Sequence, residues 1–225
     1  LIGAVRGYHV RIIMPDSVSE ERRKLVKAYG AELVLVHDDG DIGKCINECL
    51  QTALRMAKED KNVWIPQQFE NPANPMVHKS HTAQEIIEQV DGFCSGVGTG
   101  GTLSGIGETL KSKYPEIHIW AVEPKNAAIL SGGSIGTHLQ MGIGDGLIPK
   151  NLNTQIYEHI DIVTDEEAIE TSRRLIREEG ILCGISSGTN VTAALRLAKE
   201  LGEGKTVVTV LPDTGERYFS TVLFD

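Results

Sequence analysis

The chain lacks the features that would place it in a membrane or on a nucleic acid. No apolar run approaches the roughly 20 residues that are needed to span a bilayer. Basic residues are outnumbered, because 22 Lys and Arg face 31 Asp and Glu, for a net charge of −9. A diffuse acidic surface repels the phosphates of nucleic acids and of anionic lipids. We therefore expect no nucleic-acid partner and no membrane partner.

The chain also lacks CxxC pairs, although it contains four cysteines. Cys45 and Cys49 lie one helical turn apart, and His78, His81 and Glu85 recur along another stretch, but neither group completes a zinc site. We expect no metal ion. Thiols that lie unpaired in apolar segments indicate a reducing compartment, and hence a cytoplasmic protein.

A signal peptide is missing as well. The first residues, 1–6, are typical of the tail of a helix, with no basic region and no cleavage site before them. We expect the chain to start inside a fold and to be truncated at its N-terminus.

Short apolar runs alternate with longer amphipathic stretches along the sequence. The runs predict strands at 10–14, 31–36, 63–65, 92–97, 118–122, 160–163 and 206–211. The stretches predict helices at 19–29, 42–58, 76–89, 102–113, 165–179 and 187–201. Strands that are apolar on both faces and are followed by helices indicate an α/β fold with parallel sheets covered on both sides.

The ends of several helices can also be predicted. Thr164 or Asp165 is expected to cap the helix at 165–179, and Gly180 to end it. Ser187 is expected to cap the last helix rather than to bind a ligand. The turn cluster at 71–75 marks a seam between two domains.

Glycine provides 24 of the 225 residues and concentrates at 96–107, 132–146 and 180–188. Glycine is used where a backbone bends sharply or approaches a ligand closely, so these are candidate site loops. In the first of them, Gly98, Thr99, Gly100, Gly101 and Thr102 join a buried strand to a helix. Free amides, two hydroxyls and the positive end of the helix dipole together form an anion cradle that suits a phosphate ester.

The same loop permits a second interpretation. Residues 96–101 match the pattern G-x-G-x-x-G, and the next strand ends in Glu123. An acidic residue at this spacing is typical of dinucleotide-binding folds, so an NAD-dependent Rossmann dehydrogenase stays open on this segment alone.

Five segments, in order, resemble the cysteine synthases, which are also called O-acetylserine sulfhydrylases. They are QQFENPANP at 67–75, GVGTGGT at 96–102, GIGDG at 142–146, EEGI and GISSG at 178–188, and LPDTGERY at 211–218. The resemblance implies a fold-type-II, tryptophan synthase β-like enzyme with two three-layer α/β domains and pyridoxal 5'-phosphate between them. Residues 1–70 would be the remainder of the smaller N-terminal domain, and residues 71–225 the larger domain that binds the cofactor.

The resemblance also assigns roles to residues. By this analogy the loop from Gly98 to Thr102 holds the cofactor's phosphate, and Thr214 faces the pyridine nitrogen. Gln68 would lie near the substrate carboxylate, and Gly142 would line the pocket behind the cofactor. Without the resemblance, Thr214 would be expected only to cap a turn.

The family's Schiff-base lysine and its substrate-carboxylate loop would lie before Leu1, so no catalytic residue is expected within this chain. We expect a fragment of an active enzyme rather than a degenerate protein, and a fragment that is inactive alone.

The implied reaction converts O-acetyl-L-serine and sulfide into L-cysteine and acetate by β-elimination and β-replacement through an aminoacrylate. The family resemblance further implies a homodimer and docking of the C-terminal tail of serine acetyltransferase. A cystathionine β-synthase-like enzyme, a non-catalytic module that binds this tail and the dehydrogenase are the alternatives.

Overall fold

The computed structural model describes residues 1–86 and 90–225, which form two compact units. The first comprises Leu1–Pro66 with Gly215–Asp225, and the second comprises Gln67–Thr214. The predicted domains divide the chain after residue 70 and assign 215–225 to the second domain, whereas this segment packs within the first unit. None of the described helices is long and apolar enough to cross a bilayer.

The first unit contains a two-stranded parallel sheet, in which Arg11 of one strand pairs with Glu32 of the other. Its strands are β1 (Arg11–Pro15) and β2 (Glu32–Val36). Its α-helices are α1 (Ile2–Arg6), α2 (Glu20–Ala28) and α3 (Ile42–Glu59), and its 3₁₀ helices are η2 (Gly215–Tyr218) and η3 (Val222–Phe224). The strand predicted at 63–65 is wrong, because the Val63 amide donates to Asp60 O within a turn.

The C-terminal segment is held to α2 by partly buried polar contacts. The Ser19 hydroxyl donates to Arg217 O over 2.7 Å, and Arg22 Nη2 donates to Tyr218 Oη over 2.7 Å. The Tyr218 side chain is fully buried. These contacts explain why residues from both ends of the chain form one unit.

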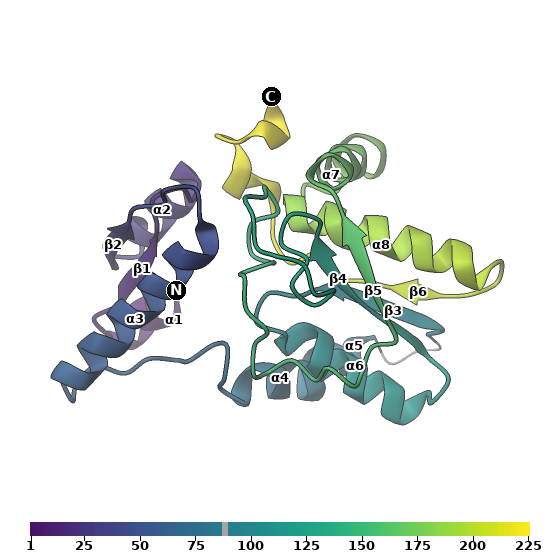
Figure 1. The fold of residues 1–225 in the computed structure, drawn as a ribbon, viewed down its shortest axis with the longest axis horizontal. Coiled ribbons are helices and arrows are strands. Elements are labelled where there is room, and N and C mark those ends of the chain that lie inside the picture. The colour runs from purple at the N-terminus through teal and green to yellow at the C-terminus, as the bar shows by residue number, and fades with distance from the viewer. Residues whose placement is uncertain (87–89) are drawn as a thin grey trace. The chain divides into compact units, whose positions relative to one another are not determined.

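The second unit is built on a parallel four-stranded sheet in the order β5-β4-β3-β6 (Figure 1). The strands are β3 (Gly92–Gly96), β4 (His118–Pro124), β5 (His159–Val163) and β6 (Val207–Val208). One face is covered by α6 (Gly101–Lys113) and the other by α8 (Ile185–Leu201), on which α7 (Asp165–Glu179) packs. The predicted α/β fold with parallel, doubly covered strands is thereby confirmed.

The core of this unit lies between α6 and the sheet. Phe93 and Ala121 of the central strands pack with Leu103, Ile106 and Leu110 of the helix, and all five are fully buried. An apolar helix face on a continuous apolar strand removes both surfaces from water, which is the main favourable term in folding. The beginning of α6 is therefore held rigidly above the end of β3.

The predicted ends of α7 are confirmed, because Thr164 forms a capping box with Glu167 and Gly180 adopts the left-handed conformation at φ 70°. The predicted capping of α8 by Ser187 is wrong. Gly184 is the N-cap, and its amide donates to Asp213 O. Ser187 is buried inside the first turns of α8 instead.

The helix predicted at 76–89 is wrong as a single α-helix. It consists of α4 (Ala73–Val77), the π-helix η1 (His78–Thr82) and α5 (Ala83–Glu85). It begins early because the Asn71 side chain accepts a hydrogen bond from the Ala73 amide. The predicted end at 87–89 lies outside the described residues.

We predict that Gly188→Ala destabilises the second unit by about 1–3 kcal/mol, because it overpacks the contact between α7 and α8. A Cβ at position 188 would lie 1.9 Å from Ala168 O and 2.8 Å from the Ser172 amide nitrogen. Both neighbours are backbone atoms that cannot move aside without moving α7.

Gly107→Ala is the matched control, since it also replaces a glycine inside a helix of this unit. Its Cβ would meet only side chains, the nearest being Ile156 Cγ1 at 3.2 Å. For this variant we expect urea denaturation to show little loss in the free energy of unfolding, because alanine favours a helix by about 1 kcal/mol over glycine. Equal stability of the two variants would refute the packing argument.

Candidate functional site

Two of the loops that were singled out by their glycines, at 96–107 and 132–146, meet at the carboxyl edge of the parallel sheet. This edge is where open α/β sheets bind their ligands. The first loop leaves β3, and the second follows β4 and ends at 142–146. The Gly144 amide donates to Val97 O over 3.0 Å, which brings the two loops into direct contact.

The loop from Gly98 to Thr102 presents hydrogen-bond donors. Within the described part of the chain, no acceptor pairs with the amides of Gly98, Thr99 and Gly100. Gly100 caps α6 with φ 77°, a conformation that L-residues rarely adopt. These amides and the positive end of the helix dipole favour an anion at this place.

Other segments approach this loop so closely that side chains could not be accommodated. A Cβ on Gly98 would lie 2.5 Å from Gly142 O, and one on Gly100 would lie 2.7 Å from Leu152 Cβ. A Cβ on Gly101 would lie 2.0 Å from Asn74 Oδ1. The glycines are therefore required for packing as well as for exposing the amides, and the structure brings Gly142 against Gly98.

Asn74 connects two of the predicted site residues. Its Nδ2 donates to Gln68 O and to Thr99 Oγ1, each over 2.8 Å. Asn151 Nδ2 also donates to Gln68 O over 2.8 Å. Because the Thr99 oxygen already accepts a hydrogen bond, its own proton is left to donate to a ligand. Asn74 lies in the predicted turn at 71–75, but no sequence pattern gave it a role or marked Asn151.

Thr214 comes from a different part of the second unit. It forms an isolated antiparallel bridge with Cys183, immediately before α8. The segment that leads to it is held by Asn190 of α8, whose Nδ2 donates to Val210 O over 2.7 Å. Asn190 Oδ1 in turn accepts from the Gly96 amide over 2.7 Å, at the end of β3. Asn190 therefore ties the glycine loop and the approach to Thr214 to one helix, and the sequence did not reveal it.

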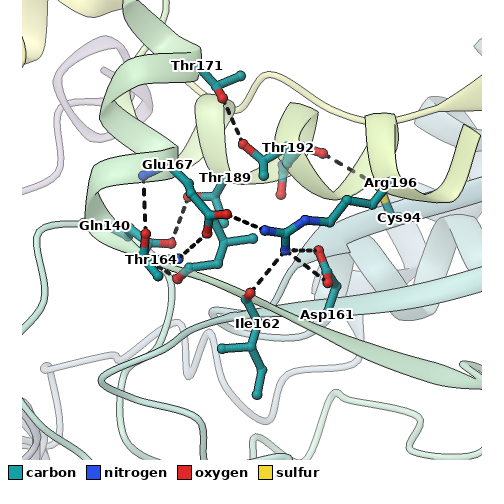
Figure 2. Close-up of polar contacts among 12 residues, drawn as sticks. Cys94, Gln140, Asp161, Ile162, Thr164, Glu167, Thr171, Thr189, Thr192 and Arg196 are labelled. Atoms are coloured by element: carbon teal, nitrogen blue, oxygen red, sulfur yellow. Dashed lines mark hydrogen bonds and ion pairs between the residues drawn. The ribbon is translucent and has the colours of Figure 1, made fainter. Parts of the chain in front are cut away.

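Gln140 anchors the segment that precedes the 142–146 loop (Figure 2). This side chain is fully buried, and its Nε2 donates to Val163 O over 3.0 Å and to Asp165 Oδ1 over 2.9 Å. Its Oε1 accepts from Thr189 of α8 over 2.8 Å. One amide thus satisfies polar groups from β5, α7 and α8, which fixes where the following loop begins.

Arg196 lies about two turns after Thr189 on α8 and reinforces the same region (Figure 2). Its guanidinium pairs with Asp161 of β5 over 2.9 Å and with Glu167 of α7 over 2.5 Å. A planar guanidinium suits such a double contact. These pairs hold α7 and α8 together beside the sheet.

Asp145 adds a carboxyl group beside the glycine loop. Its Oδ2 lies 3.6 Å from the position that a Cβ on Gly98 would occupy. Burial raises the pKa of Asp145, against a smaller opposing influence of His138. The 142–146 segment was predicted only through its glycines, so this acidic neighbour of the anion cradle is an addition from the structure.

The dinucleotide interpretation fails at Glu123. This carboxylate is buried, and it accepts hydrogen bonds from the Leu130 amide, the Ser131 amide and the Ser131 hydroxyl over 2.8, 3.0 and 2.5 Å. It stabilises the turn after β4. A side chain used in this way is not available to hold the ribose hydroxyls of NAD, as the fingerprint requires.

Comparison with known proteins agrees with this geometry. The family model described as "Pyridoxal-phosphate dependent enzyme" matches residues 1–213. The chain belongs to this family. The pyridoxal-phosphate cofactor that the resemblance implied is thereby confirmed.

Within the pyridoxal-phosphate enzymes, the chain is similar to cysteine synthases. It is 52% identical to a cysteine synthase of Staphylococcus aureus over 98% of its own length and 71% of the relative's. The crystal structure of a cysteine synthase from Entamoeba histolytica is 39% identical, with a TM-score of 0.90 over 99% of this chain and 66% of that one. An O-ureido-L-serine synthase structure is 40% identical, with a TM-score of 0.91 over 100% of this chain and 71% of that one. The resemblance inferred from the five motifs is confirmed.

The residues of the glycine loop fit the phosphate of this cofactor. Three adjacent amides pair with no acceptor among residues 1–86 and 90–225, and the Thr99 hydroxyl has its proton available. Thr102 stands in the first turn of α6, where the helix dipole adds to the attraction. A phosphate monoester needs several donors and a positive field, and the loop provides both.

Two of the cysteine thiols, those of Cys49 and Cys94, are poor nucleophiles. Burial raises the pKa of both Cys49 and Cys94 to about 12, so both stay protonated near neutral pH. Among residues 1–86 and 90–225, no group of three or more His, Cys, Asp and Glu side chains is arranged to hold a metal ion.

We predict that Asp145→Asn raises the thermal stability of the protein at pH 7. Because burial raises the pKa of Asp145, the folded protein holds this proton more tightly than the unfolded chain does. The stabilising contribution of the protonated Asp145 carboxyl to the free energy of unfolding is complete below the ordinary aspartate pKa. It is lost as the pH rises through the raised pKa. The advantage of the variant should therefore shrink as the pH falls toward 4.

Asp91→Asn is the control of opposite sign. The Thr206 amide and the Lys205 ammonium lower the pKa of Asp91, so its charge stabilises the fold at neutral pH and this contribution is lost in acid. Thermal melts between pH 4 and 8 compare the two variants with the parent. A lower melting temperature for Asp145→Asn than for the parent at pH 7 would contradict the argument.

Proposed function

We propose that the protein is a cysteine synthase that uses pyridoxal 5'-phosphate to make L-cysteine and acetate from O-acetyl-L-serine and sulfide. The observation that carries this proposal is the cradle formed by the amides of Gly98, Thr99 and Gly100, which have no acceptor in the part of the chain that the structure describes. It lies at the carboxyl edge of the sheet, in a chain that is 52% identical to a cysteine synthase. The geometry of the loop and the sequence similarity to cysteine synthases therefore both favour pyridoxal phosphate.

Bound pyridoxal phosphate supplies the electron sink that lets an amino acid lose its α-proton and then its β-substituent. The amides of 98–100 and the hydroxyls of Thr99 and Thr102 hold the phosphate by charge-assisted hydrogen bonds. Asn74 Nδ2 donates a hydrogen bond to the Thr99 oxygen. The hydroxyl proton of Thr99 is therefore left to donate to the phosphate. The chain's part in the reaction is therefore to fix the cofactor before the chemistry begins.

Thr214 is proposed as the partner of the pyridine nitrogen. A hydroxyl is neutral, so unlike a carboxylate it does not hold a proton on that nitrogen. A ring without this proton withdraws fewer electrons, which suits prompt loss of the β-substituent. The bridge to Cys183 holds the backbone of Thr214 beside α8 and supports a fixed position for the hydroxyl.

Gln68 and Gly142 are proposed to serve the substrate. The backbone of Gln68 is fixed by two amide donors, from Asn74 and Asn151, next to the glycine loop. We place the Gln68 side chain near the substrate carboxylate. Gly142 has φ 95°, and a Cβ at this position would meet no atom within 4 Å, so open space lies beside this residue.

The quaternary and cellular assignments rest on the family resemblance. We propose a homodimer in the cytoplasm that can dock the C-terminal tail of serine acetyltransferase. The four cysteines are free and buried, which agrees with a reducing compartment.

The test uses the full-length protein, with cysteine formation measured from O-acetylserine and sulfide. We expect Thr99→Val to weaken the binding of pyridoxal phosphate about tenfold, because one hydrogen bond to a charged group is lost. Fluorescence titration of the apoprotein with the cofactor measures this change.

Thr109→Val is the matched control. The Thr109 hydroxyl donates to Gly105 O within α6 and lies away from the loop. We expect its cofactor affinity to equal that of the parent. If the parent forms no cysteine, or if NAD binds where pyridoxal phosphate does not, the proposed function is refuted.

A further inference from the structure

His78 lies between two hydroxyl groups, one of which belongs to the candidate phosphate loop. Its Nδ1 is 3.0 Å from Thr82 Oγ1, and its Nε2 is 3.3 Å from Thr102 Oγ1. All three residues are partly buried, and all belong to the second unit. The imidazole therefore joins the π-helix η1 to the first turn of α6.

Close packing holds this imidazole in place. A Cβ on Gly105 of α6 would lie 2.4 Å from Pro75 O and 2.6 Å from His78 Cβ, so the π-helix lies directly against α6. Lys79 of η1 also forms an ion pair with Glu108 of α6. A π-helical turn is rare and is frequently found at functional sites, and here it presents His78 to Thr102.

Burial lowers the pKa of His78, so its ring is neutral near pH 7. A neutral imidazole has one nitrogen that donates and one that accepts. The contacts with Thr82 and Thr102 can therefore be arranged in two ways. Either Thr82 donates to Nδ1 and Nε2 donates to Thr102, or the direction of both hydrogen bonds is reversed.

The two arrangements differ in what Thr102 offers to a ligand. When Nε2 donates to Thr102 Oγ1, the hydroxyl proton of Thr102 is free to point into the loop. When the direction is reversed, that proton is committed to His78, and only lone pairs of Thr102 face the loop. A phosphate is attracted by the first arrangement and repelled by the second.

We propose that Thr82, His78 and Thr102 form a hydrogen-bond relay that turns the Thr102 hydroxyl toward the bound phosphate. The phosphate in return selects the His78 tautomer with hydrogen on Nε2. This inference rests on the proposed function, because it takes the anion at residues 98–102 to be the cofactor's phosphate. His78 and Thr82 act through Thr102, so they are positioning residues.

Thr99 shows the same arrangement in a permanent form. Its oxygen accepts from Asn74 Nδ2, which is an amide nitrogen that can only donate. The proton of Thr99 is therefore always left for the ligand. His78 gives Thr102 the same support through a group that can reverse, so only the Thr102 contact can respond to the ligand.

The first experiment measures the tautomer directly. The protein is labelled with ¹⁵N-histidine, and its ring nitrogen shifts are recorded with and without saturating inorganic phosphate, then with pyridoxal phosphate. We expect the His78 signals of both complexes to be those of the Nε2–H tautomer. An Nδ1–H tautomer with phosphate bound would overturn the proposal.

The second experiment is a double-mutant cycle on phosphate affinity. We expect His78→Phe and Thr102→Val each to weaken binding of inorganic phosphate about tenfold. The double variant should be weaker by about tenfold rather than about a hundredfold, because His78 acts only through Thr102. His78→Gln, whose side-chain amide can donate to Thr102, should recover most of the affinity.

Thr82→Val should weaken phosphate binding to a smaller extent, because it removes only the donor to Nδ1. His81→Phe is the matched control, since this exposed histidine of the same π-helix contacts Ser80 rather than α6. Its phosphate affinity should be unchanged. Additive losses in the cycle, or a loss for His81→Phe equal to that for His78→Phe, would overturn the relay.

Different results would refute the cofactor site and the hydrogen-bond relay. If neither phosphate nor pyridoxal phosphate shifts the amide signals of Gly98 to Gly101, the proposed function fails, and the relay fails with it. If those amides respond and the cycle is additive, the cofactor site stands and the relay alone is refuted.

Discussion

Side-chain-free backbone at Gly98, Gly100 and Gly101 is the constraint on which the site depends. Three other segments pack against these positions at distances that no Cβ would allow. The same positions leave adjacent amides without acceptors among the described residues. The missing Cβ atoms allow both the tight packing and the exposed amide donors. A substitution at one of these glycines should therefore disturb the packing and the donors together.

Side-chain amides make several of the long-range connections around this loop. Asn74 joins Gln68 to Thr99, Asn190 joins β3 to the segment before Thr214, and Gln140 joins β5, α7 and α8. An amide both donates and accepts, so one buried side chain can satisfy two segments at once. Such a network holds binding groups in place before the ligand arrives, which lowers the cost of ordering them.

The glycine pattern at 96–101 illustrates how one backbone device serves different cofactors. Free amides at the start of a helix bind phosphate groups in general, so the pattern alone left a dinucleotide open. Glu123 argues against a dinucleotide, because its carboxylate accepts hydrogen bonds from the turn at 130–131 and is not available to a ribose. The family match across residues 1–213 argues for pyridoxal phosphate instead.

The sequence by itself determined the fold class, the ends of α7 and the family, because these depend on local periodicity, capping residues and contiguous motifs. Tertiary structure alone decided the rest. Ser187 lies inside α8 because Gly184 bonds to Asp213, and the helix expected at 76–89 contains a π-helix packed against Gly105. Asn190, Gln140 and the contact between His78 and Thr102 join residues that are distant in the sequence. No local pattern marks such partners, because the free energy that pairs them arises only when separate segments pack together.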